Sequence, residues 1–211
     1  MLTNRAFETM IANANTAMPH KAPPIHLVAA PITHAAGMAA LWLLPLGATN
    51  VILARPDPET VMAAISEHKV TTLFLPPTVI YMMLAHPRAR EFDFSAMDYF
   101  VYCGGPMSTD KVKQAIDLFG PCMTQIYGQA ECPCTITILS PDDHLEALGD
   151  PAKEGRLNSC RRPPIFVKVE MMDDDGNLVA QGEWGEIVVR GTFVSLGYYG
   201  DPEASEAIRA H

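Results

Sequence analysis

The sequence has no excess of basic residues, no apolar run long enough to cross a membrane and no signal-peptide pattern. Its 211 residues carry a formal net charge of −9 without a basic stripe, so nucleic acids and anionic membrane surfaces are poor candidate partners. The longest apolar run, residues 35–48, contains glycine and proline and is too short for a transmembrane helix. We therefore expect a cytoplasmic globular protein, with its oligomeric state left open.

Two further patterns are missing. The five cysteines have irregular spacing, which argues against a disulfide framework, and Cys132 and Cys134 lack the spacing and partner ligands of a zinc site. We expect them to be reduced, buried or half-buried thiols. No Gly-x-Gly-x-x-Gly element follows a predicted strand, which argues against a nicotinamide enzyme.

Short apolar runs alternate with longer amphipathic segments through the first 140 residues. The runs are typical of buried strands, and the longer segments place apolar residues at helical spacing behind capping residues such as Thr3, Asp57 and Ser108. Predicted strands cover 25–30, 49–53, 70–75, 99–103 and 122–127, and predicted helices cover 3–15, 35–46, 58–68, 78–85 and 108–119. This alternation predicts an α/β fold in which helices cover both faces of a parallel sheet.

The pattern changes near residue 141. Apolar and polar residues alternate over 165–171, a turn is expected over 173–177, and a second β run covers 185–190. A glycine- and tyrosine-rich loop follows over 191–202, with a short helix over 203–210. We predict an α/β subdomain over 1–140 and a smaller antiparallel, barrel-like β segment of the same large domain over 141–211.

A parallel sheet would bring chemically useful residues to one edge, because all its strands end on the same side. The segments after four predicted strands contain His34, Pro76, Gly104 and residues 127–131. Glycines let a flat ligand approach the backbone, Tyr127 offers a stacking face, and Glu131 is an oxygen ligand suited to Mg²⁺. We therefore expect a ligand site at this edge.

Several separated segments together resemble the adenylate-forming superfamily, which includes acyl-CoA ligases, luciferases and peptide-synthetase adenylation domains. Residues 127–131 resemble its Tyr-Gly-x-Thr-Glu element, and residues 103–107 (Cys-Gly-Gly-Pro-Met) resemble its adenine loop. Residues 31–34 (Pro-Ile-Thr-His) resemble the segment lining the acyl pocket, and residues 182–199 resemble the Gly-Glu-Ile/Leu…Gly-Tyr element near the end of the large domain. The resemblance covers nearly the whole chain.

The resemblance implies an ATP-dependent ligase that adenylates a fatty or other apolar carboxylate and transfers the acyl group to CoA. Its cofactors and co-substrates would be ATP/AMP, Mg²⁺ and coenzyme A. Glu131 would be the catalytic carboxylate that binds Mg²⁺, and His34 would sit at the mouth of the acyl pocket. The nucleotide would be held by the remaining matched positions, Gly104, Gly105, Pro106, Tyr127, Gly128, Gln129 and Ala130.

The resemblance also implies that the chain is an internal fragment of the large N-terminal domain. The phosphate loop would precede Met1, and the Thr-Gly-Asp element and the C-terminal lid domain would follow His211. We expect such a fragment to bind ATP weakly or not at all and to be inactive alone.

Two positions depart from the family pattern. Ala130 stands where the family usually has a threonine that hydrogen-bonds the AMP phosphate, and Arg161 stands where Gly-Arg-Pro usually supplies a glycine. Two alternatives stay open: an amino-acid-type adenylation domain, which is the nearest rival, and a non-catalytic nucleotide-binding remnant, which these two departures keep open. The first would require an acidic residue in the substrate pocket, and the loops near His34 and Cys103 contain none.

Overall fold

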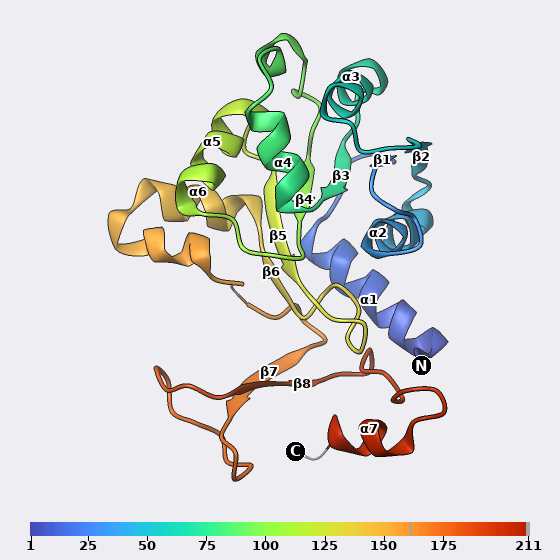
Figure 1. Cartoon of the computed structure of the whole chain (residues 1–211), viewed down its shortest axis with the longest axis vertical. Coiled ribbons are helices and arrows are strands. Elements are labelled where there is room, and N and C mark those ends of the chain that lie inside the picture. The colour runs from blue at the N-terminus through green and yellow to red at the C-terminus, as the bar shows by residue number, and fades with distance from the viewer. Residues whose placement is uncertain (161, 210–211) are drawn as a thin grey trace.

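A six-stranded sheet forms the centre of the protein, whose computed structural model describes residues 1–160 and 162–209. The strand order is β2-β1-β3-β4-β5-β6, and the first five strands are parallel (Figure 1). Each of the five predicted strands is one or two residues shorter than predicted. The strands are β1 (Ile25–Val28), β2 (Thr49–Ile52), β3 (Thr72–Leu75), β4 (Tyr99–Tyr102), β5 (Met123–Tyr127) and β6 (Thr137–Leu139).

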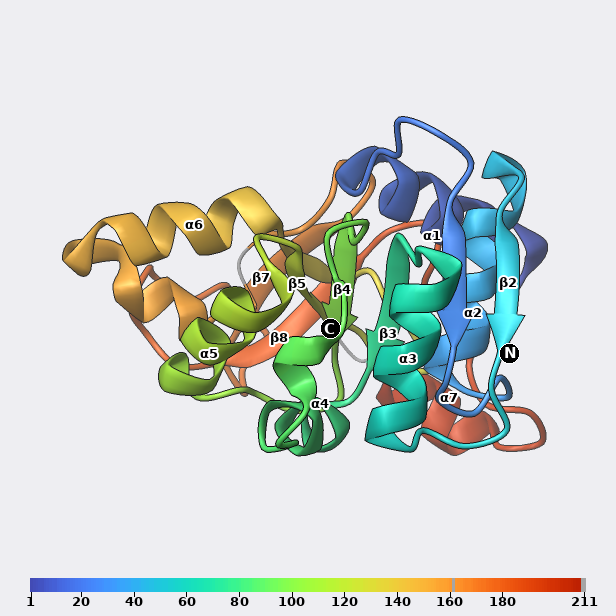
Figure 2. The same ribbon diagram turned by 90° about the horizontal axis from the view of Figure 1, so that it is seen from above.

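Helices cover both faces of this sheet, which confirms the predicted α/β class. α1 and α2 pack on one face against Val28, Phe74 and Val101, while α3, α4 and α5 pack on the other against Leu73 and Phe100 (Figure 2). The chain steps from β1 outward to β2 and then back past β1 to β3, so right-handed connections place α2 and α3 on opposite faces. The helices are α1 (Asn4–Ala17), α2 (Ala35–Leu43), α3 (Pro58–His68), α4 (Pro77–Leu84) and α5 (Thr109–Phe119).

The predicted helix starts are found, with one difference in chemistry. Thr3 caps α1 by accepting the N–H of Ala6, and Asp57 caps α3 by accepting the N–H of Thr60. Ser108 stands at the N-cap of α5, but its side chain makes no capping hydrogen bond. The apolar helix predicted over 35–46 ends at Leu43 and continues as a 3₁₀ turn to Leu46, where Gly47 adopts a left-handed φ of 72°.

Two features near residue 140 differ from the sequence prediction. β6 runs antiparallel to β5, so the sheet is mostly and not wholly parallel. The segment after it begins with α6 (Pro141–Gly149) and the 3₁₀ segment η3 (Pro151–Asn158), where only β structure was expected. Ser140 explains the helix, because it forms a capping box with Asp143. The division into two subdomains at residue 140 stays a prediction.

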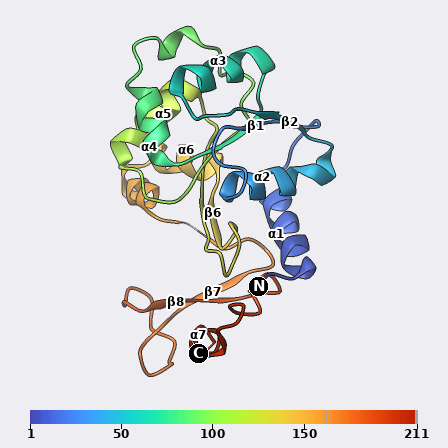
Figure 3. The ribbon, with the colours of Figure 1, turned by 45° about the vertical axis from the view of Figure 1, so that its right-hand side comes forward.

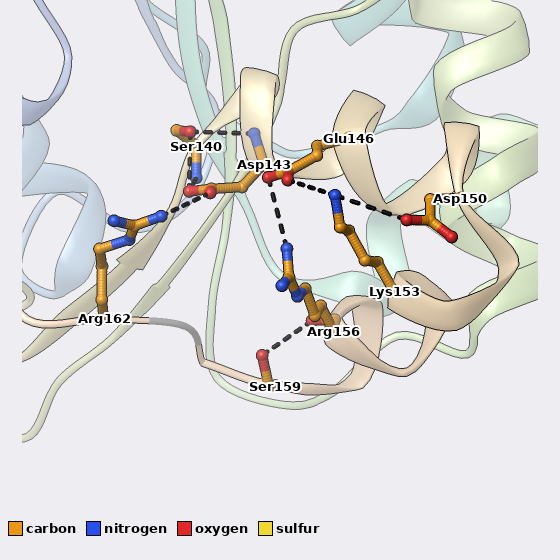
Figure 4. Close-up of polar contacts among 8 residues, drawn as sticks. All are labelled: Ser140, Asp143, Glu146, Asp150, Lys153, Arg156, Ser159 and Arg162. Atoms are coloured by element: carbon orange, nitrogen blue, oxygen red, sulfur yellow. Dashed lines mark hydrogen bonds and ion pairs between the residues drawn. The ribbon is translucent and has the colours of Figure 1, made fainter.

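Polar contacts hold α6 to η3 at the surface (Figure 4). Lys153 pairs with Glu146 at 2.8 Å and with Asp150 at 3.4 Å, and Arg156 also reaches Glu146 at 3.4 Å. Arg162 contacts Asp143 at 3.3 Å. Most of these side chains are partly exposed to solvent, so each pair contributes little stability, and the buried Ala147 and Leu157 anchor the segment.

The remaining residues form the smaller antiparallel segment that was predicted. β7 (Lys168–Met172) pairs with β8 (Glu186–Arg190), and α7 (Pro202–Ala207) follows; all three lie at one end of the molecule (Figure 3). The described residues contain this two-stranded sheet and not a closed barrel. Arg161 and the predicted end of the last helix at Ala210 lie outside the described residues.

Two apolar clusters lie on the two faces of the large sheet, and a third apolar cluster joins this end of the molecule to the α/β layer. It contains Ala6 from α1, Cys132 and Ile136 from the connection between β5 and β6, and Val167 and Phe193 from the C-terminal segment. No helix in the described part of the chain is both long and apolar enough to cross a membrane.

Candidate functional site

Four connecting segments leave the sheet on the same edge. β1, β3, β4 and β5 are parallel, and their carboxyl ends lead to His34, Pro76, Gly104 and the loop of residues 127–136. The predicted common edge is therefore present. In parallel α/β sheets this is the edge at which ligands bind.

The loop after β5 has a tightly packed backbone. The Ile136 N–H donates to the Tyr127 carbonyl at 2.9 Å, and Gln129 and Cys132 exchange two backbone hydrogen bonds of 3.1 and 3.2 Å. A Cβ atom on Gly128 would lie 2.5 Å from the backbone nitrogen and Cα of Cys134. Glycine at 128 thus has a packing reason in addition to the nucleotide role that the resemblance implies.

Glu131 is the half-buried carboxylate of this loop, and the C-terminal segment holds it at two points. The Ser195 N–H donates to the Glu131 carbonyl at 2.7 Å, and the Tyr198 hydroxyl donates to Glu131 Oε1. The hydrogen bond to this carboxylate raises the pKa of the Tyr198 phenol above its ordinary value. One carboxylate oxygen of Glu131 is therefore occupied by a protein donor.

The other predicted residues of the loop differ in exposure. Tyr127 is half-buried against the third apolar cluster, and its hydroxyl accepts a hydrogen bond from Gln129 Nε2 at 2.9 Å. Gln129 and Ala130 are exposed. Ala130 offers no hydroxyl at the position where the family usually has one.

The glycine pair after β4 leaves open space at the edge. Gly104 has a φ of +86°, a conformation that favours glycine, and a Cβ atom on either Gly104 or Gly105 would meet no atom within 4 Å. Gly104 and Pro106 are exposed. Beneath them, burial raises the pKa of the Cys103 thiol.

His34 is exposed at the N-terminus of α2. Its backbone N–H donates to Pro31 and its carbonyl accepts from Gly37, while its ring has no hydrogen-bond partner among the described residues. A Cβ atom on Gly37 would lie 1.9 Å from the Ile32 carbonyl oxygen, so this glycine lets the 31–34 segment fold back onto the helix. His34 shares the edge with Glu131 but makes no described hydrogen bond to it.

Sequence reasoning assigned no role to Tyr198 or Ser195. The Gly-Tyr-Tyr motif at 197–199 drew attention to the segment, but the Tyr198 contact joins residues 67 positions apart. No local pattern indicates such a contact.

The donor set at this edge fits a magnesium ion that arrives with a nucleotide. In the described part of the chain, no three His, Cys, Asp or Glu residues group as metal ligands. Mg²⁺ is commonly bound by one or two carboxylates together with substrate phosphates and water. Glu131 can supply such a carboxylate through Oε2, which has no protein donor within the described residues.

A separate surface hollow lies away from these residues. It has a volume of about 300 Å³ and is lined by Ala17, Ile138, Ser140, Asp143, Arg162, Pro163 and Pro164. Ser140 follows the β6 residue that pairs with Gln125, so the hollow lies toward the amino end of β5. It is not part of the candidate site.

Comparisons with known proteins agree with the fold. The family described as AMP-binding enzyme matches residues 1–199. A medium/long-chain fatty-acid–CoA ligase of Mycobacterium tuberculosis is 35% identical over 182 residues, which cover 86% of this chain and 30% of that relative. A feruloyl-CoA synthase of an Amycolatopsis species is 34% identical over 184 residues, covering 86% and 35%.

Among solved structures, an amide bond synthetase from Marinactinospora thermotolerans superposes with a TM-score of 0.88 at 30% identity. The match covers 98% of this chain and 40% of that one. The chain thus spans about a third of the length of the curated relatives named above.

Proposed function

The chain belongs to the AMP-binding enzyme family, and from that premise we propose that its full-length protein joins an apolar carboxylic acid to CoA at the expense of ATP. In the first step a carboxylate oxygen attacks the α-phosphorus of ATP, and the bond to pyrophosphate breaks. In the second step the CoA sulfur attacks the acyl carbonyl, and AMP leaves. Both steps depend on positioning and on neutralising phosphate charge.

Each predicted residue has a place in this proposal. Glu131 holds the metal through its carboxylate, and bound Mg²⁺ would neutralise phosphate charge. Tyr127 stacks on the adenine, and residues 104–106 bound its other side. Gly128 lets the backbone of Cys134 pack closely against the residue that follows β5. Gln129 orients the Tyr127 hydroxyl.

The observation that carries the proposal is the convergence of the matched segments on one sheet edge. The adenine-loop glycines, the Tyr127–Glu131 loop and His34 come from three separate parts of the sequence, and they follow parallel strands of the same sheet. Open space above Gly104 and Gly105 suits the approach of a flat base.

An apolar acid is favoured by the surroundings of α2. Ala35 and Met38 are half-buried near the start of this helix, and they pack on the same apolar cluster as Cys103 and Cys134. His34 would stand at the mouth of this region. The relatives named above act, by their names, on fatty acids and on ferulate, and we propose a fatty acid as the first class to test.

Two alternatives remain as outcomes of the test. An amino-acid substrate would need an acidic partner for its ammonium group, and residues 29–38 and 103–107 contain no Asp or Glu. A non-catalytic remnant is kept open by Ala130, which lacks the phosphate-binding hydroxyl of the family pattern.

The deciding experiment is ATP–pyrophosphate exchange by the full-length protein. The panel should contain short-, medium- and long-chain fatty acids, hydroxycinnamic acids and amino acids, with Glu131→Gln as the control for the metal role. We expect exchange with apolar acids and its near-complete loss in Glu131→Gln. Exchange with no acid would end the ligase proposal, exchange with amino acids alone would favour the rival, and full activity in Glu131→Gln would remove the metal role.

A further inference from the structure

Tyr198 is the side chain that bonds the Glu131 carboxylate in the described part of the chain. Its hydroxyl donates to Oε1, and Oε2 is left without a protein donor. A glutamate has three rotatable side-chain torsions, and a fixed loop backbone does not fix the position of its carboxylate. A hydrogen-bond donor to one of its oxygens can fix the position of the carboxylate.

The segment that carries Tyr198 is anchored to the same loop. The Ser195 N–H donates to the Glu131 carbonyl at 2.7 Å, and Phe193 is fully buried in a cluster that also contains Cys132 and Ile136. Backbone and side chain of Glu131 are therefore both bonded from residues 195–198. The two contacts fix the distance between the loop after β5 and the C-terminal segment.

The backbone of Tyr198 is hydrogen-bonded to α7. Its backbone N–H donates to Ser205 Oγ at 2.8 Å, and Ser205 Oγ in turn donates to the Asp201 carbonyl at 2.6 Å. Gly197 has a φ of +108°, and a Cβ atom there would lie 2.5 Å from Ser205 Oγ. The glycine thus lets the chain pass close to α7, and the hydrogen bond to Ser205 fixes the backbone position of Tyr198.

The neighbouring Tyr199 provides a contrast within the same segment. It is 91% exposed, against 39% for Tyr198, and its hydroxyl has no hydrogen bond among the described residues. The two tyrosines have the same chemistry, and only Tyr198 contacts Glu131. Tyr199 is therefore a natural control for the role of the Tyr198 hydroxyl.

We propose that Tyr198 is a positioning residue that holds Glu131 with Oε2 free for the metal that accompanies the nucleotide. This inference rests on the proposed function, in which Glu131 is the metal ligand. Tyr198 touches neither nucleotide nor metal in this role. Removing its hydroxyl should weaken metal binding without altering the binding of the acid.

The test is metal affinity in the full-length protein, measured without turnover. Mn²⁺ replaces Mg²⁺, and electron paramagnetic resonance reports free Mn²⁺ in the presence of α,β-methylene ATP. Loss of one neutral-to-charged hydrogen bond predicts that Tyr198→Phe weakens Mn²⁺ binding roughly 10- to 100-fold. Tyr199→Phe is the matched control and should stay close to the wild type.

Two further variants separate positioning from general destabilisation. Ser205→Ala should shift Mn²⁺ affinity in the same direction as Tyr198→Phe but by less, with circular dichroism reporting whether each variant is folded. Tyr198→Phe should have no further effect in a Glu131→Gln background, because the group that it positions is gone. An equal additional loss in that background would contradict the proposal.

The remaining outcomes are distinct. If Glu131→Gln loses Mn²⁺ binding while Tyr198→Phe equals Tyr199→Phe, the positioning role is wrong and the proposed function stands. Tighter binding in Tyr198→Phe would also overturn it, since the tyrosine would then compete with the metal. If Glu131→Gln binds Mn²⁺ as the wild type does, the metal role in the proposed function fails, and the positioning role fails with it.

Discussion

Replacing Gly128 with alanine should destabilise the protein through one contact. The new Cβ atom would lie 2.5 Å from the nitrogen and Cα of Cys134 and 2.7 Å from its carbonyl carbon. All three are backbone atoms, so no side-chain rotation relieves the overlap. Cys134 already has a φ of 59°, which is uncommon for a residue with a side chain, and its backbone therefore has little freedom to move.

The expected cost follows from overpacking. Forcing extra volume into a well-packed site typically costs about 1 to 3 kcal/mol. For a domain of this size, each kcal/mol lowers Tm by roughly 2 to 4 °C, so the melting temperature should fall by roughly 2 to 12 °C. Differential scanning calorimetry or thermal melting followed by circular dichroism would measure the change.

Gly149→Ala is the matched control. A Cβ atom there would meet nothing within 4 Å, and its φ is not in the left-handed region. We expect its stability to equal that of the wild type or to exceed it by up to about 1 kcal/mol. The reasoning would be refuted if Gly128→Ala had the melting temperature of the wild type. It would also be refuted if both variants lost the same stability, since steric contact would then not explain the effect.

Three further perturbations test other parts of the structure. Burial lowers the pKa of His26 and of His144 from 6.5, so the unfolded chain binds protons that the folded chain does not as the pH falls below about 6.5. The free energy of unfolding, measured in urea, should therefore be steady above this pH and decline below it; a flat profile would contradict this, and His34→Gln at an exposed position should leave the decline unchanged. Ala130→Thr should tighten AMP binding to the full-length protein roughly ten- to hundredfold, measured by calorimetry, by restoring a charge-assisted hydrogen bond. Ala130→Val adds the same bulk without a hydroxyl, so equal tightening in both would refute that cause. Burial raises the pKa of Cys122 to about 12, so its alkylation near pH 8 should be slow in the folded protein and fast in urea, and equal rates would show that the thiol is accessible.

The parallel sheet was predictable because both of its signals are local. Apolar runs such as Leu73–Leu75 face helices on both sides, so apolar and polar residues do not alternate along them. The capping residues Thr3 and Asp57 indicate the starts of the helices that follow. β6 was not predicted as a strand: it has three residues, and its antiparallel direction depends on the tight loop before it. The start of α6 was visible in Ser140 and Asp143, but the β pattern beyond residue 165 was extended back over it.

The candidate site was predictable to the extent that it follows strand ends. Tyr127, Gly104 and His34 share an edge because their strands are parallel, and the spacing of strands and helices already implied that direction. The contact between Tyr198 and Glu131 has no such basis. It depends on how a segment 67 residues further along the chain returns to the sheet, and no periodicity or cap encodes that return.

The third apolar cluster packs the loop after β5 against the C-terminal segment that carries Tyr198. Phe193 is fully buried with Cys132 and Ile136, and the Ile136 N–H donates to the Tyr127 carbonyl at the end of β5. Shifting the 191–202 segment would therefore remove apolar burial, the Ser195 bond and the Tyr198 bond together. The geometry of Glu131 should therefore depend on the contacts of Phe193 and Ser195 as well as on the sheet edge from which the loop projects.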